Sequence, residues 1–588
     1  MKQRLALAAL LLATAAAPTS APVTTPSRPN IVILLADDWG FTDVGAFGGE
    51  MATPNIDALA ANGVRFSNFH VAGSCAPTRA MLQTGVSSHR AGLGNMPETI
   101  PPAHLGRPGY DAVFNTNIVT IAERLRGAGY RTFLTGKWHL GHTLPNLPTS
   151  RGYDHAFALS QSGADNFENK PNLLLYEKAD WTEDGKPADL PADFYSSRFV
   201  VDKMIEYIGR SDQSKPFLAS INFLANHIPL QAPDADLARN RGRYDAGWTQ
   251  LRDARRAGAI AKGVMPPGVA MVTMRSTHDW NGLMPAEQAQ RRGAMEAYGA
   301  MATAMDREVG RLVAHLKATG QYENTVFVFL SDNGPEATDP MVADLPRANA
   351  IYNYDQSIEN QGRPGSLTAI GAGWASAAAA PLRGYKFTAS EGGLRVPLII
   401  SWPGNPAITK GAVASGFAHV IDVTPTLLQF AGVAPVAVPG KAPITGQSLV
   451  PMLRGGTAGV RAADEPLGYE LSGNAVLWQG DLKLVKNLPP YGDGEWHLFD
   501  IVRDPGETTD LRRARPFAFR RMQAAYAAYA KADQVLPMPP GYTAPKQIMD
   551  NAWEDLFWPR TKPLLIRLVG GLALIGAVVW AIKRRRKA

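Results

Sequence analysis

The stretch NIVILLADDWG, Asn30–Gly40, decides the fold class of this 588-residue chain. Its residues 31–36 form a continuous apolar run of Ile, Val, Leu and Ala, which predicts a strand buried on both faces, as in a parallel sheet. Two acids, Asp37 and Asp38, follow directly. Because sites in open α/β sheets form outside the carboxyl ends of the strands, the stretch predicts a core strand with a polar site at its end.

The same pattern recurs along the chain. A short helix is predicted near 55–62, a strand near 64–70, and a long helix before a strand at 325–330. Two more strands are predicted to end near Lys137 and Phe223. Strands that alternate with helices predict an α/β fold, in which a large mixed, mostly parallel sheet is sandwiched by helices. We expect this main domain to cover 28–409.

Three other regions have a different composition. The region 231–276 is rich in Arg, Gly and Pro and is predicted to be an irregular surface insertion, and 339–380 is predicted to be loop-like. The segments GDLKLVKNL and WHLFDI predict short hairpin strands, and a helix is predicted near 517–531. These elements predict a smaller C-terminal α+β subdomain at 410–537, followed by a proline-bearing linker at 538–562.

The two ends of the chain resemble targeting segments. Met1–Arg4 is positively charged and Leu5–Ala17 is mostly Leu and Ala, which predicts a signal peptide over 1–21; the alternative is a buried first helix. Residues 564–582 are apolar except for Arg567, which predicts a transmembrane helix at 563–582 and a basic cytoplasmic tail at 583–588. The alternative is a helix lying on the membrane surface. We therefore expect an exported body in the periplasm or extracellular space, anchored by one C-terminal helix.

The positive net charge does not indicate a nucleic-acid-binding protein. The formal charge is +7, but the basic residues at 583–587 together with Lys2 and Arg4 account for all of it. The body of the chain is therefore close to neutral, and we expect no nucleic-acid partner.

The only cysteine, Cys75, lies in the stretch GSCAPTRAML. It has no partner for a disulfide within the chain, although an exported chain would normally pair its cysteines. Pro77 suits the first turn of a helix, which places Cys75 at a helix N-terminus, where an anion is stabilised. From this context alone, Cys75 is either a nucleophile or an inert core residue.

Two further groups of polar residues follow predicted strands. Asp37, Asp38, Asp332 and Asn333 are hard oxygen ligands that suit Ca²⁺ or Mg²⁺ better than Zn²⁺, although each pair alone could be a cap or a turn. The cationic and imidazole groups could neutralise a multi-oxygen anion and move protons, or be structural. Together the two groups suit a sulfate or phosphate ester held beside a divalent metal. The members of the second group are Lys137, His139, His227 and Lys386.

Several of these motifs resemble the sulfatase family, within the alkaline-phosphatase-like superfamily. Cys75, Pro77 and Arg79 occupy the fixed positions of the sulfatase signature, and GKWHLG, SDNG, PLRGYKFTASEGGLRVP and IDVTPTLL resemble other blocks of the family. The resemblance implies that a separate maturation enzyme oxidises Cys75 to Cα-formylglycine. The stretch RGRYDAGWTQLRDARRAGAI resembles bacterial arylsulfatases, which implies small aromatic sulfate esters as substrates.

The resemblance also implies a role for each site residue. Ca²⁺, or less readily Mg²⁺, would be bound by Asp37, Asp38, Asp332, Asn333 and the modified Cys75. Arg79 would orient the hydrated aldehyde and His139 would take its second proton. The sulfate group would be held by Lys137, His227 and Lys386.

The sequence therefore predicts an arylsulfatase, a hydrolase that cleaves aryl or related sulfate esters to an alcohol or phenol and inorganic sulfate. One alternative is a phosphomonoester, phosphodiester or phosphonate ester hydrolase of the same superfamily. A second is a non-catalytic, membrane-anchored protein that binds anions, which would hold if Cys75 is never modified.

Overall fold

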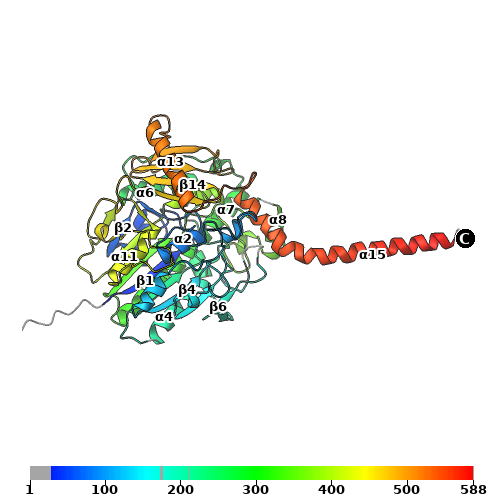
Figure 1. Cartoon of the computed structure of the whole chain (residues 1–588), viewed down its shortest axis with the longest axis horizontal. Helices are drawn as coiled ribbons and strands as arrows, with labels where there is room; N and C mark the ends of the chain where they lie inside the picture. Colours follow the sequence, from blue (N-terminus) through cyan, green and yellow to red (C-terminus); the bar gives the residue numbers. More distant parts are fainter. Residues whose placement is uncertain (1–27, 172–175, 211, 343, 587–588) are drawn as a thin grey trace, which may run out of the picture.

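The computed structural model describes residues 28–171, 176–210, 212–342 and 344–586. The signal peptide predicted over 1–21 lies outside this range. The fold has two sheets of four or more strands, one in the main body and one near the C-terminus (Figure 1).

A ten-stranded sheet forms the centre of the main body, in the order β11-β2-β10-β9-β1-β8-β4-β5-β6-β7. Strand β1, Asn30–Ala36, pairs in parallel with both β8 and β9. Strand β10 pairs antiparallel with β9 and β2, and β6 and β7 form an antiparallel edge. The predicted large mixed, mostly parallel sheet is confirmed. The other strands are β2 (Gly63–Phe66), β4 (Arg131–Lys137), β5 (His155–Leu159), β6 (Trp181–Glu183), β7 (Lys186–Pro187), β8 (Phe217–Asn222), β9 (Thr325–Ser331), β10 (Leu398–Ser401) and β11 (Ala412–Ala414).

Helices cover both faces of this sheet, and β1 shows why. Its alternate side chains enter two different cores, with Val32 and Leu34 in one and Ile31 and Ile33 in the other. A strand buried on both faces must be apolar throughout, as the sequence indicated. The first core is covered by α1 (Pro54–Ala61), α4 (Ser196–Arg210) and α7 (Pro285–Ala318). The second is covered by α2 (Cys75–Thr84), α3 (Ile121–Gly127) and α11 (Val423–Phe430).

Three local predictions are wrong. The region 231–276 is not an irregular surface insertion, because it contains α5 (Asp234–Asn240) and α6 (Gly247–Ala261), and Trp248 of α6 packs edge-on against Trp374 at 5.5 Å. The region 339–380 contains α8 (Asp344–Asn353) and α9 (Gly371–Ala378). The strand predicted at 64–70 is divided into β2 and β3 (Phe69–His70), which belong to different sheets.

The C-terminal part of the body contains a four-stranded antiparallel sheet, β13-β14-β15-β16, with α13 packed against it (Figure 1). Buried leucines of this sheet and Met522 of α13 form a separate small core. The predicted C-terminal α+β region is thus present; its domain boundary at 410 stays a prediction. The elements of this part are β12 (Ala418–His419), α12 (Val450–Leu453), β13 (Leu467–Leu471), β14 (Asn474–Gln479), β15 (Leu482–Lys486), β16 (Trp496–Asp500) and α13 (Pro516–Ala532), whereas the short α10 (Glu391–Leu394) precedes β10 in the main body.

Beyond residue 540 the chain forms α14, Ala544–Ala552, a π-helical turn, Trp553–Phe557, and α15, Trp558–Arg585. Helix α14 lies within the segment predicted to be a linker and packs on the turn Pro97–Thr99 of the main body. Helix α15 projects away from the body, is exposed along its length, and is long and apolar enough to cross a membrane (Figure 1).

Candidate active site

The predicted site residues meet at the carboxyl ends of β9, β1 and β4, which belong to a run of four neighbouring strands, β9-β1-β8-β4. Asp37 and Asp38 follow β1, Asp332 follows β9, and Lys137 ends β4. All four are buried, and Cys75 opens α2 beside them. Parallel strands bring their carboxyl ends to one edge of the sheet, so residues separated by up to 295 positions come together there.

Three carboxylates form the centre of the site. Single ligand atoms of Asp37, Asp38, Asp332 and Cys75 all lie within 4.8 Å of one another. Asn333 donates from Nδ2 to Asp38 Oδ1 at 2.6 Å, whereas its own Oδ1 is buried without a hydrogen-bond partner among the described residues. Burial, and the nearby charge of Asp37, raise the pKa of Asp38 to about 8 against the opposing effect of Lys386. A hard divalent cation would relieve this crowding and use the unpaired amide oxygen, so the residues fit such an ion.

Each carboxylate also has a cation beside it. Lys137 Nζ lies 2.6 Å from Asp37 Oδ2, and Lys386 Nζ lies 2.8 Å from Asp38 Oδ1. Arg79 donates to Asp332 Oδ2 from Nε at 2.9 Å and from Nη2 at 2.7 Å. Three cations therefore offset the three carboxylates, and the guanidinium is fixed in place by two hydrogen bonds to one oxygen.

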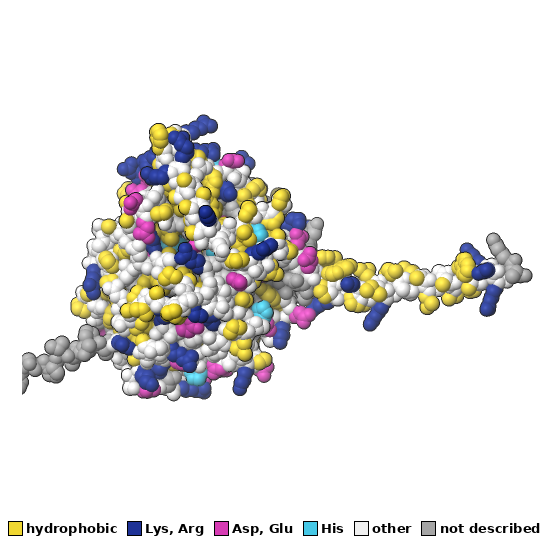
Figure 2. Space-filling model, in the orientation of Figure 1, with side chains coloured by type: hydrophobic (Ala, Val, Ile, Leu, Met, Phe, Trp, Pro, Cys, Tyr) yellow, Lys and Arg dark blue, Asp and Glu magenta, His cyan; other side chains and the backbone are white. Residues whose placement is uncertain are grey.

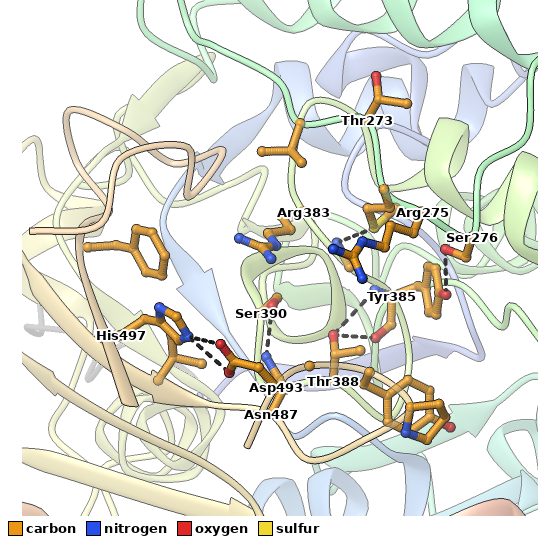
Figure 3. Close-up of a pocket in the computed structure, with 18 residues that line it drawn as sticks. Thr273, Arg275, Ser276, Arg383, Tyr385, Thr388, Ser390, Asn487, Asp493 and His497 are labelled. Atoms are coloured by element: carbon orange, nitrogen blue, oxygen red, sulfur yellow. Dashed lines mark hydrogen bonds and ion pairs between the residues drawn. The ribbon is translucent and has the colours of Figure 1, made fainter. Parts of the chain in front are cut away.

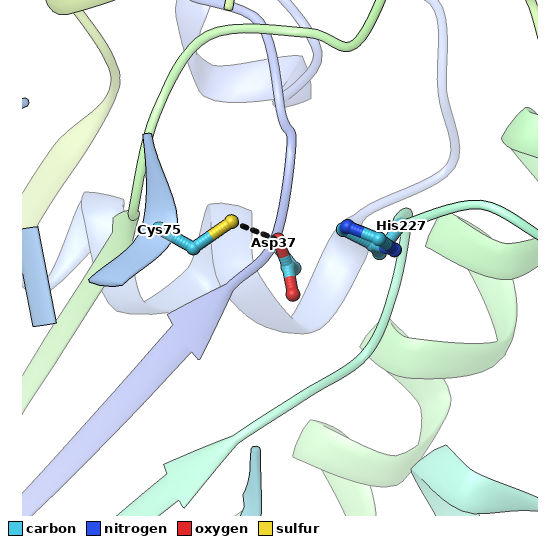
Figure 4. A group of neighbouring side chains, drawn as sticks. All are labelled: Asp37, Cys75 and His227. Carbon is cyan, nitrogen blue, oxygen red and sulfur yellow. Dashed lines mark hydrogen bonds between the residues drawn. The ribbon is translucent and has the colours of Figure 1, made fainter. Parts of the chain in front are cut away.

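Cys75 is a buried thiol at the first position of α2, as its sequence context predicted. Its Sγ donates to Asp37 Oδ1 at 3.7 Å, and Figure 4 shows His227 on the other side of Asp37. Single ligand atoms of these three residues lie within 4.8 Å of one another. Burial raises the pKa of the Cys75 thiol, although Lys137 and Lys386 oppose this. As a cysteine, therefore, the residue stays protonated and is a weak nucleophile.

The geometry sets the protonation of His227. Its Nδ1–H donates to the carbonyl oxygen of Ile228 at 2.7 Å, which leaves Nε2 directed at the site, 3.9 Å from Asp38 Oδ2. Burial and the positive charges of Lys137 and Lys386 hold the pKa of His227 well below its usual value. The ring is therefore neutral at neutral pH.

His139 has a carboxylate partner that the sequence did not indicate. Its Nε2 lies 3.0 Å from Glu98 Oε1, and Nδ1 is buried with no hydrogen-bond partner within the described part of the chain. Burial lowers the pKa of His139. Burial alone would raise the pKa of Glu98, but the charge and hydrogen bond of His139 and the hydrogen bond from Tyr176 lower the pKa of Glu98 to about 2. The pair is thus a carboxylate and a neutral imidazole with Nε2–H donating, so Nδ1 carries the free lone pair.

Sequence reasoning missed three polar residues around the site. Tyr176 donates a short hydrogen bond to Glu98, and Glu336 Oε2 lies 3.2 Å from Lys386 Nζ. Glu98 lies in the turn Pro97–Thr99, 41 positions before its partner His139. No local pattern marks such a residue, because the contact depends on tertiary structure alone.

Two cavities lie near this part of the fold. A cavity of about 420 Å³ is bounded by His227 and Lys386 and therefore opens on the site. A second, more polar cavity of about 540 Å³ is lined by Arg275, Arg383 and His497 (Figure 3). Its lining includes none of the predicted site residues, so the first cavity is the one that can hold a substrate of this site.

Comparison with known proteins identifies the family. The model of the sulfatase family matches residues 29–433, the range that holds every predicted site residue. The chain belongs to the sulfatase family. This sulfatase is 36% identical over 421 residues to an arylsulfatase of Klebsiella aerogenes, covering 71% of this chain and 89% of that protein. It is 34% identical over 541 residues to an uncharacterised sulfatase of Schizosaccharomyces pombe, covering 88% of this chain and 96% of that protein.

Solved structures share the same fold. The crystal structure of Ps i-CgsB matches with a TM-score of 0.62 and 24% identity, covering 91% of this sulfatase and 99% of that chain. The phosphonate monoester hydrolase of Agrobacterium radiobacter matches with a TM-score of 0.50 and 20% identity, covering 87% of this sulfatase and 96% of that chain. These matches establish the alkaline-phosphatase-like fold. The family match and the arylsulfatase relative support sulfate ester hydrolysis as the reaction class.

Proposed function

We propose that this sulfatase is an arylsulfatase that uses formylglycine and a divalent metal. The observation that carries the proposal is the convergence of Asp37, Asp38 and Asp332 on Cys75, with their ligand atoms within 4.8 Å of one another. Once oxidised to formylglycine by a separate maturation enzyme, residue 75 would supply a hydrated aldehyde, with one hydroxyl as the nucleophile toward sulfur and the other to allow release of sulfate. The products are a phenol or alcohol and inorganic sulfate.

The acidic residues hold the metal. Asp37, Asp38 and Asp332 provide carboxylate oxygens, and Asn333 provides the amide oxygen that has no other partner among the described residues. A site made of protein oxygens favours Ca²⁺ over Mg²⁺, which usually keeps several waters. Held by these residues, such an ion would supply Lewis-acid polarisation of the sulfate group.

The basic residues hold the sulfate and move protons. Lys137, His227 and Lys386 surround the space beside Cys75 and bind the oxygens of the sulfate group. Arg79, fixed by Asp332, orients the nucleophile of residue 75. His139 accepts a proton at Nδ1, because its Nε2–H is held by Glu98.

We also propose that the protein is exported and held to a membrane by α15, with its body in the periplasm or extracellular space. The apolar α15 and the basic residues that follow it support this orientation. The near-neutral body gives no support for a nucleic-acid partner.

Parallel assays of an aryl sulfate and the matching aryl phosphate test the activity. We expect release of sulfate about a hundredfold faster than release of phosphate, because a phosphate monoester carries an additional negative charge and the described residues offer ligands for one metal at this site, not two. Cys75→Ala should fold and yet lose turnover. Preferential release of phosphate would support the phosphoester alternative instead, and no release of either would support an anion-binding protein.

A further inference from the structure

The cavity that opens on His227 and Lys386 is mainly apolar. Its volume of about 420 Å³ is within the range of pockets that enclose a small organic molecule. A few polar side chains line it, such as Ser162, Glu336 and Asp339. Most of its wall is hydrophobic and includes Met96, Leu367, Phe387, Ala544, Ile548 and Met549.

Helix α14 supplies one side of this wall and is fixed to the catalytic body. Asn551 donates from Nδ2 to the carbonyl oxygen of Glu98 at 3.0 Å. Just before α14, the Tyr542 hydroxyl donates to the backbone carbonyl oxygen of Thr99 at 2.8 Å. Both contacts hold α14 on the turn that carries Glu98. The wall is therefore a built part of the site, although it comes from a segment more than 400 positions away.

The same helix leads directly into the candidate membrane helix. Only the π-helical turn Trp553–Phe557 separates α14 from α15. Trp553 and Trp558 are 52% and 43% exposed at this junction, where aromatic side chains suit a membrane interface. Helix α8 also lines the cavity, and its Ile351 and Tyr352 are 55% and 85% exposed. Figure 2 shows hydrophobic side chains along α15 and where it meets the body.

We propose that the substrate of this site is an amphiphilic sulfate monoester, whose extended apolar group lies in the α14 cavity. The inference rests on the proposed sulfatase activity and names the group attached to the sulfate. The sulfate end meets His227 and Lys386, and the apolar end contacts Met549 and its neighbours. Hydrolysis breaks the S–O bond to the bridging oxygen; water supplies the new oxygen of sulfate, and the apolar product leaves as an alcohol or phenol with the added proton.

Two features favour this class over a sulfated sugar. Burying sugar hydroxyls against the apolar wall would leave them without hydrogen bonds, which costs binding energy. An alkyl or fused-ring group instead gains binding energy for each methylene removed from water. The position of the wall beside α15 also suits a molecule that partitions into a membrane.

The test compares 4-methylphenyl sulfate, 4-hexylphenyl sulfate and glucose 6-sulfate with the full chain in lipid nanodiscs. Free substrate concentrations are measured, and kcat/KM is taken from release of sulfate. We expect kcat/KM to be about tenfold or more higher for the hexyl than for the methyl compound, and lowest for the sugar. Equal values for the two aryl sulfates, or a preference for the sugar, would overturn the inference and leave the sulfatase activity intact. No hydrolysis of any of the three would instead overturn the proposed function itself.

A pair of variants separates the pocket from simple partitioning into lipid. Met549→Asp places a charge in the α14 wall and should reduce the hexyl-to-methyl ratio to about one, whereas Met549→Leu keeps the wall apolar and should retain the preference. Retention of the full ratio by Met549→Asp would overturn the inference. Because the substrate comparison uses the unaltered chain, it decides the question even if Met549→Asp does not fold.

Discussion

At the scale of single residues, each buried carboxylate of the site is paired with a cation or an amide group. Asp332 is held by two hydrogen bonds from Arg79, and Asp38 is held by Lys386 and Asn333. Unpaired, these carboxylates would be costly to bury. Their arrangement therefore serves both to keep the site folded and to present oxygens to a cation.

Removing one of these charges should weaken metal binding. We expect Asp332→Asn, which keeps the shape of the side chain, to raise the Ca²⁺ concentration for half-maximal activity about tenfold or more, because affinity depends on ligand charge. EDTA should abolish turnover of the unaltered enzyme, and Ca²⁺ should restore it. The surface variant Asp202→Asn should behave as the unaltered enzyme. Full activity after EDTA treatment would rule out the metal site.

The His139–Glu98 pair leads to a prediction about pH. The carboxylate of Glu98 stabilises the protonated imidazole and so acts to raise the pKa of His139. Burial has the larger, opposite effect, so the pKa of His139 is lowered overall. In Glu98→Gln this support is lost, the pKa of His139 falls, and its basic form persists to lower pH. We therefore expect the acidic limb of the kcat/KM profile to move to lower pH, with kcat about tenfold lower because the ring is less well held. An unmoved limb would show that Glu98 does not act through His139.

The sequence could indicate that the acidic residues of this site lie together, but not which residues support them. Asp37, Asp38 and Asp332 follow apolar strands, a pattern that is visible locally. Glu98 lies in an irregular turn, and its partners come from distant segments. A contact of this kind has no periodicity in the sequence, so only the folded chain shows it.

At the scale of elements, α6 shows why part of the fold could not be predicted. Its arginine-rich sequence resembles an exposed segment, yet Arg255 is buried and its Nη1 lies 2.5 Å from Asp43 Oδ1. The Tyr298 hydroxyl bonds both to Asp43 and to the carbonyl oxygen of Asp38. Helix α6 thus supports the loop that carries Asp38 through a buried ion pair, and composition alone does not distinguish such a helix from one with a solvated face.

Breaking this ion pair should destabilise the protein. We expect Arg255→Ala to lower the free energy of unfolding by about 3 kcal/mol or more, since it leaves Asp43 buried without its cation. Arg256 is on the same helix but is only half-buried, so Arg256→Ala should lower the free energy of unfolding by much less. Thermal unfolding of the two variants in parallel checks this, and equal melting temperatures would contradict the role of α6.

At the scale of the whole molecule, the C-terminal segment has two separable parts. Helix α14 is packed on the catalytic body and walls the substrate cavity, whereas α15 is exposed and buries no side chain in the fold. The boundary between catalysis and anchoring therefore lies after α14, within the segment that the sequence predicted to be a linker.

Two truncations test this division. A chain that ends at Phe557 should leave the membrane fraction and remain active on 4-methylphenyl sulfate, because it loses no packed element. A chain that ends at Pro539 also loses α14 and should have kcat/KM lower by about tenfold or more, since the wall and the support of Glu98 are gone. Sedimentation and release of sulfate measure both properties. Membrane retention of the longer truncation would contradict the anchor.

The mass of the tryptic peptide Phe66–Arg79 from the active, membrane-bound protein shows directly whether Cys75 is modified. Conversion of Cys75 to formylglycine lowers the mass of this peptide by about 18 Da, and we expect the converted fraction to rise in proportion to the rate of sulfate release. An active preparation in which this peptide carries only the cysteine thiol would rule out formylglycine as the nucleophile.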